Sequence, residues 1–256
     1  MKQAFILFLE FVAIQLIGGF LVSTIWRLCS GSAEPSTAQL ITVTCVTSVL
    51  TIALFLMTRA AEVSPQWLRT RPWAVLSWSC VAALGTLIPS SWLQEQLPEL
   101  PNFVEQEFDM ILSNRWGYLA VGLLAPLTEE LVLRGAILRS LLRSSRLSPW
   151  GAIVISAVLF AVVHFNPVQM PHAFLIGLLL GWMYYRTGSI LPGVAFHWVN
   201  NTVAYVLYNL YPNSASDMKL IDLFGTQRTV AAALLFSLFI LLPALYQLHL
   251  RMRKAE

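Results

Sequence analysis

Long apolar stretches, separated by charged or Pro/Gly-rich breaks, dominate the chain. There are eight of them: Phe5–Trp26, Leu40–Met57, Trp73–Ser90, Trp116–Leu138, Trp150–Phe165, Ala173–Tyr185, Ile190–Tyr211 and Val230–Leu248. About 20 helical residues cross a hydrocarbon core of roughly 30 Å. The sixth stretch is short for a crossing, and the others are close to the required length or exceed it. The pattern predicts an all-α, polytopic transmembrane helical bundle with about eight spans.

The composition supports a membrane protein. Hydrophobic residues make up 57% of the 256 residues and charged residues 11%, whereas soluble domains carry about 25% charged residues. The mean hydropathy is +0.68. So few charges cannot cover a water-soluble surface. No internal repeat or low-complexity segment divides the chain, so we expect one integral membrane domain over residues 1–256.

The basic residues predict an orientation. Basic side chains are enriched in cytoplasmic loops of membrane proteins. With a cytoplasmic N-terminus, eight spans leave four basic residues outside (Arg27, Arg115, Lys219 and Arg228). They place eleven inside: Lys2, Arg59, Arg69, Arg71, Arg139, Arg143, Arg146, Arg186, Arg251, Arg253 and Lys254. This division favours eight spans with both termini cytoplasmic.

The longest loop, residues 91–115, is acidic. It carries five carboxylates and two prolines, and the orientation above makes it extracytoplasmic. A solvated surface loop is the expected structure, and a short amphipathic helix over the mouth of an active site is the alternative.

The remaining composition narrows the partners and the compartment. No lysine- or arginine-rich block is present, so nucleic acid is not an expected partner, whereas the lipid bilayer is. Cys29, Cys45 and Cys80 are scattered and odd in number, which fits buried free thiols better than a disulfide framework or a metal site. Short loops and the lack of an organellar targeting segment favour a prokaryotic plasma membrane.

Charged groups inside the fourth stretch need an explanation. A charge at the bilayer centre costs about 2.5–3.5 kcal/mol on insertion scales, yet this stretch holds Glu129, Glu130 and Arg134. Glu130 and Arg134 are four residues apart and share a helix face, so they can pair. Glu129 lies about 100° from Glu130 around the helix, too far for Arg134 to cover it easily. The spacing predicts one carboxylate with a structural partner and one free to act as a general base.

Two further stretches carry polar groups that could complete a site. His164 ends the fifth, and the seventh contains His197 and, four residues later on the same face, Asn201. An imidazole and a carboxamide side by side suit a developing oxyanion. A single histidine in a membrane helix is more often a hydrogen-bonding group between helices. Three helices that contribute Glu, His and His/Asn make a catalytic site the better interpretation.

These residues fall into three motifs: EExxxR at Glu129–Arg134, FxxxH at Phe160–His164 and HxxxN at His197–Asn201. In this order the sequence resembles the family of CAAX prenyl proteases and bacteriocin-processing proteins, also called the abortive-infection family, over about residues 116–210. The family often has phenylalanine before the motif arginine, where this chain has Leu133. The resemblance implies a glutamate-type intramembrane endopeptidase that cuts near a substrate C-terminus or in a membrane-associated peptide.

The resemblance also implies a role for each residue. Glu129 would activate water with His164 beside it, His197 and Asn201 would bind the oxyanion, and Glu130 and Arg134 would support the helix. No cofactor or metal is expected. Two alternatives remain open. One is a zinc-dependent membrane protease that uses Glu129, His164 and His197 as ligands, and the other is a non-catalytic membrane-binding or immunity scaffold. A transporter is disfavoured, because no matched pair of broken helices is found.

Overall fold

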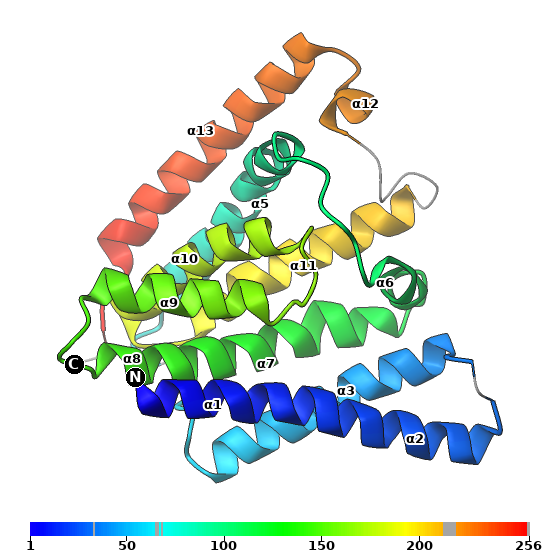
Figure 1. Cartoon of the computed structure of the whole chain (residues 1–256). Coiled ribbons are helices and arrows are strands. Elements are labelled where there is room, and N and C mark those ends of the chain that lie inside the picture. Colours follow the sequence, from blue (N-terminus) through cyan, green and yellow to red (C-terminus); the bar gives the residue numbers. More distant parts are fainter. Residues whose placement is uncertain (33, 65–66, 68, 212–218, 255–256) are drawn as a thin grey trace.

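The structure, a computed structural model, describes residues 1–256 except 33, 65–66, 68, 212–218 and 255–256. Every regular element within the described residues is helical (Figure 1). The elements, with π-helical turns written η, are α1 (Lys2–Ala13), η1 (Ile14–Gly18), α2 (Gly19–Ser30), α3 (Thr37–Met57), α5 (Trp73–Glu95), α6 (Glu105–Leu112), η2 (Tyr118–Leu124), α7 (Ala125–Val132), η3 (Leu133–Leu138), α8 (Arg139–Leu142), α9 (Pro149–Val162), α10 (Met170–Thr187), α11 (Leu191–Leu210), α12 (Leu220–Phe224) and α13 (Gln227–Arg251).

Each of the eight apolar stretches coincides with a helical segment. The first corresponds to α1, η1 and α2, which form one continuous helix, and the fourth to η2, α7 and η3. Four helices, Lys2–Ser30, Thr37–Met57, Trp73–Glu95 and Gln227–Arg251, are long and apolar enough to cross a membrane. The protein is therefore an all-helical membrane protein. The count of eight spans and the cytoplasmic termini remain predictions.

Local sequence signals fix several helix ends. The Ser36 and Ser148 hydroxyls accept hydrogen bonds from the backbone N–H groups of Gln39 (3.2 Å) and Gly151 (3.1 Å), and so begin α3 and α9. α10 ends at Gly188, whose φ of 66° is left-handed and suits glycine. These caps place the breaks between helices where the charged and polar residues of the sequence lie.

The fourth predicted stretch forms the centre of the bundle. In Figure 1 the ribbon that contains α7 lies between α9 on one side and α1 and α3 on the other. All six residues of η3 are buried, including Arg134. The start of α1, the end of α13 and α8 lie at one end of the bundle (Figure 1). At that end Arg139 pairs with Glu62, and Trp67 donates a hydrogen bond to the Arg253 carbonyl (3.2 Å).

Two expectations need correction. The acidic segment 91–115 is not a plain solvated loop, because residues 105–112 form α6, which buries Ile111 and Leu112 against the bundle. These two apolar residues give the helix a face that packs against the bundle. The surrounding carboxylates made the segment resemble a solvated loop in the sequence. The cysteines are free, but Cys29, near the C-terminal end of α2, is exposed, and Cys45 and Cys80 are only half-buried.

Candidate active site

The buried core of the site is an ion pair along one helix. Arg134 Nη1 lies 2.8 Å from Glu130 Oε1, and both side chains are fully buried. Arg134 Nη2 donates to the Gly177 carbonyl of α10 (3.2 Å), and the guanidinium lies 4.4 Å from the centre of the Phe160 ring. The pairing predicted from the four-residue spacing is confirmed. Arg134 also joins α7 and η3 to α10 and α9, so the pair organises three parts of the bundle.

Glu129 has different surroundings. Its Oε2 is buried and makes no hydrogen bond to any described residue, and His197 Nε2 lies 3.9 Å from it. The side chain is 21% exposed. The prediction that only one of the two glutamates pairs with the arginine is therefore correct: Glu130 forms an ion pair with Arg134, and Glu129 does not.

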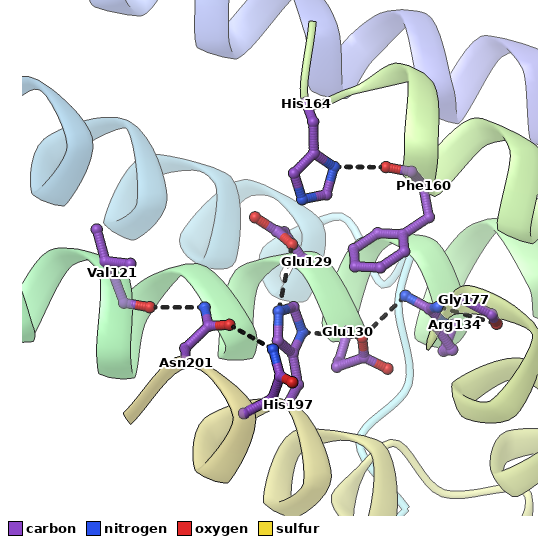
Figure 2. Close-up of polar contacts among 10 residues, drawn as sticks. Val121, Glu129, Glu130, Arg134, Phe160, His164, Gly177, His197 and Asn201 are labelled. Carbon is purple, nitrogen blue, oxygen red and sulfur yellow. Dashed lines mark hydrogen bonds and ion pairs between the residues drawn. The ribbon is translucent and has the colours of Figure 1, made fainter. Parts of the chain in front are cut away.

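His197 lies between the two carboxylates (Figure 2). Its Nδ1 is 3.4 Å from Glu130 Oε1, while Nε2 faces Glu129. An acceptor near one ring nitrogen favours the proton on that nitrogen, so Glu130 favours an N–H at Nδ1. Gly193, one turn earlier on α11, permits this approach, because a Cβ there would lie 2.6 Å from Glu130 Oε2.

His164 follows the C-terminal end of α9, just beyond the helix expected to contain it. Its Nδ1 lies 2.8 Å from the Phe160 carbonyl oxygen, so Nδ1 carries a proton and donates, and in the neutral ring Nε2 is then an acceptor. Figure 2 shows the ring directed toward Glu129. His164 and Glu129 line one cavity of about 230 Å³.

Phe160 contacts both histidines. Its ring meets His164 edge-on at 5.1 Å between centroids and His197 in the same way at 5.6 Å. With Arg134 over its face, one aromatic ring fixes three polar side chains. The sequence indicated Phe160 only as a motif position, because its contacts with Arg134 and His197 come from other helices.

Asn201 is on the same helix as His197 but bonds elsewhere. Its Nδ2 donates to the Val121 carbonyl of η2 (2.9 Å), and its Oδ1 accepts from Asn200 Nδ2 (3.4 Å). A carboxamide has two N–H donors, so this contact occupies one and leaves the other. Sequence reasoning missed the Val121 carbonyl, because no side-chain pattern marks a backbone acceptor.

A second cavity, of about 500 Å³, approaches the site from the side of Asn200. It lies among the ends of α5, α10 and α11 and beside α6 and α12, with His172 and Asp109 in its wall. His172 occupies the first turn of α10, directly after Pro171, and proline is well placed at the start of a helix.

The donor set does not converge on a metal site. Within the part of the chain that the structure describes, no three His, Cys, Asp or Glu side chains come together as ligands. Glu129 Oε2 and His197 Nε2 lie 3.9 Å apart, and His164 Nδ1 is engaged by the Phe160 carbonyl.

Comparison with known proteins gives one match. Residues 111–203 match the family model described as type II CAAX prenyl endopeptidase, Rce1-like. No curated protein and no solved structure matches the chain. The matched segment contains all three motifs, and the family resemblance inferred from them is confirmed.

Proposed function

The central segment of this chain is Rce1-like, and from that premise we propose that the protein is an intramembrane endopeptidase in which Glu129 activates the attacking water. The family match supports a membrane endopeptidase in general. The observation that carries the finer proposal is the difference between two adjacent carboxylates. Glu130 is neutralised by Arg134 at 2.8 Å, whereas Glu129 lines a cavity and its Oε2 has no hydrogen-bond partner among the described residues.

In the proposed reaction Glu129 removes a proton from water as the water oxygen bonds to the scissile carbonyl carbon. His164 Nε2, left as an acceptor by the Phe160 contact, takes a hydrogen bond from the same water. The carbonyl oxygen becomes an oxyanion. When the C–N bond breaks, the protonated Glu129 gives its proton to the leaving amine, which regenerates the carboxylate and releases two peptide fragments.

Two donors are available for the oxyanion. Asn201 has one N–H group beyond the one that binds Val121. His197 can donate from Nε2 as the imidazolium, with its Nδ1 proton facing Glu130. Donors fixed before the charge develops lower the barrier most effectively. Glu130, Arg134 and Phe160 support the reaction by holding His197 in place, without contact with the substrate.

We extend the proposal to substrate and location. The substrate is a membrane-associated peptide or protein cut near its C-terminus or within a membrane segment, and no prenyl group is required by the residues described. The chain acts as one multi-pass domain in a prokaryotic plasma membrane, with residues 116–210 as its catalytic core.

A comparison of peptide termini in membranes tests this function. Cells that express the wild type should contain membrane-protein termini that are absent from cells that express Glu129→Gln at equal abundance. An internally quenched peptide across such a site should be cleaved by purified wild type. Identical sets of termini in the two strains would contradict the proposed activity and favour a non-catalytic scaffold.

A further inference from the structure

The π-helical turn η2 contacts α11 through the hydroxyl of Tyr118. Trp198 Nε1 donates a hydrogen bond to this hydroxyl (3.0 Å), and Thr202 Oγ1 lies 3.1 Å from it. These two residues of α11 directly follow the two proposed oxyanion donors, Trp198 after His197 and Thr202 after Asn201. Residues four apart lie on one face of a helix, so a single side chain of η2 holds α11 at two points, each beside a proposed donor.

The direction of the Tyr118 hydroxyl is set by the packing of its ring. The half-buried ring lies against that of Tyr205 on α11, with 5.3 Å between the two centroids. Gly122, four residues later in η2, leaves room for it, because a Cβ at that position would overlap the Tyr118 ring. A ring held on two sides gives the hydroxyl little freedom to move away from Trp198 and Thr202.

The same turn also binds one of the proposed donors directly. Asn201 Nδ2 donates to the Val121 carbonyl of η2 (2.9 Å; Figure 2), so its second N–H is the one available to an oxyanion. The direction of that second N–H depends on the position of α11 relative to η2. A misplacement of about 1 Å can cost about 100-fold in rate. π-helical turns often occur at functional sites, and η2 carries both the Val121 carbonyl and the Tyr118 hydroxyl.

We propose that Tyr118 is a positioning residue of the active site: its hydroxyl keeps α11 in place on η2, so that Asn201 is directed at the developing oxyanion. The inference rests on the proposed function and adds to it a residue outside the three motifs. Tyr118 acts through Asn201 and not on the substrate. Its loss should therefore weaken the stabilisation of the transition state, which lowers kcat, and leave substrate binding unchanged.

Tyr118→Phe tests this role, because it removes the hydroxyl and keeps the ring. With the quenched peptide identified as above, kcat should fall about tenfold, because the donor is misplaced, while KM should not change. The thermal midpoint should fall only slightly, since one hydrogen bond between membrane helices contributes little to stability. The matched control is Tyr205→Phe. Tyr205 is the other ring of the pair, is also half-buried, and its hydroxyl donates to the Asn114 carbonyl (3.1 Å), so kcat should not change.

A double variant shows whether Tyr118 acts through Asn201. Asn201→Ala removes the donor that Tyr118 is proposed to direct. In that background Tyr118→Phe should have no further effect on kcat, because the effects of two changes to one functional unit do not add. The same tenfold loss in both backgrounds would contradict the inference, as would a wild-type kcat for Tyr118→Phe or an equal loss for Tyr205→Phe.

If Tyr118→Phe does not fold, Thr202→Val is judged by the same criteria, since it removes a partner of the same hydroxyl. Failure of the proposed function gives a different result. Full activity of Glu129→Gln would contradict that function, and the inference would fall with it. Loss of activity in Glu129→Gln but not in Tyr118→Phe would overturn the inference alone.

Discussion

The side chains of Glu129 and Glu130 leave neighbouring positions of α7 in different directions. Glu130 lies against Arg134 inside the bundle, and Glu129 borders a cavity with its Oε2 unpartnered by the described residues. An amide at Glu129 would keep the shape of the carboxylate and break no hydrogen bond of that oxygen. A substitution at Glu129 can therefore change the catalytic rate without a change in the stability of the fold.

We predict that Glu129→Gln abolishes proteolysis while yield and thermal midpoint stay at wild-type values. Loss of a general base costs about 10²–10⁴-fold in rate. Turnover of the quenched peptide by purified protein in detergent measures the effect. If more than a tenth of wild-type turnover remained, Glu129 could not be the base.

At the scale of single residues, the sequence predicted that Glu130 pairs with Arg134 and Glu129 does not, because helical spacing alone decides which carboxylate reaches the arginine. It could not predict the Phe160 contacts, the bond from Asn201 to Val121, or the bonds of Tyr118 to α11. Each depends on how separate helices pack, or on a backbone carbonyl that has no sequence signal.

At the scale of the helices, Arg134 holds neighbouring helices together. Its guanidinium pairs with Glu130, donates to Gly177 of α10 and covers Phe160 of α9. The pair thus ties the central helix to two neighbours. Gly177 itself approaches Ala157 of α9 so closely that a Cβ would lie 3.0 Å from its Cα. Close helix packing and the buried pair stabilise the same region.

Arg134→Ala should lower yield and thermal midpoint as well as activity. The change leaves Glu130 buried without its partner, and breaking a buried pair costs about 3–5 kcal/mol. The double variant Glu130→Gln with Arg134→Met should recover part of the stability in a thermal denaturation assay. A stable but inactive Arg134→Ala would instead assign the arginine to the chemistry, and a double variant no better than the single would mean that the two residues are not partners.

The apolar pattern predicted the long helices of the bundle but not its irregular parts or the short helix α12. All eight stretches coincide with helical segments because apolar length dictates a helix in lipid, where backbone groups must bond within the chain. α6 was only the weaker alternative, since its carboxylates resemble those of a loop. The π-helical turns were not predicted, because hydropathy does not show how many residues make up each turn of a helix.

For the whole molecule, the decisive chemical question is whether the reaction needs a metal. We predict that purified, tag-free protein contains no stoichiometric zinc and keeps its activity after prolonged treatment with o-phenanthroline. Elemental analysis and turnover of the quenched peptide are the measurements. One zinc per chain, lost and regained together with activity, would support a site built from Glu129, His164 and His197 and replace the metal-free mechanism.

The orientation can be tested with a natural probe. Cys29 is exposed near the end of the continuous helix Lys2–Ser30, about 40 Å from its start at 1.5 Å per residue. With cytoplasmic termini, a membrane-impermeant maleimide should label Cys29 in intact cells, and Cys29→Ser should abolish the label. In that background Ser145→Cys, at the arginine-rich end, should react only after permeabilisation. The reverse labelling pattern would mean that the termini lie outside the cytoplasm.

The π-helical turns limit which sequence changes the central helix can tolerate during evolution. A π turn is in effect an α-helix with one inserted residue, and the residues that follow it are rotated by about 100° relative to an unbroken helix. η2 precedes the two glutamates, and η3 contains Arg134. Exchange of one apolar residue for another preserves this rotation, whereas loss of a single codon does not, although hydropathy and span length barely change. Descendants of this sequence can therefore exchange one apolar residue for another in these segments, but the segments must keep their length.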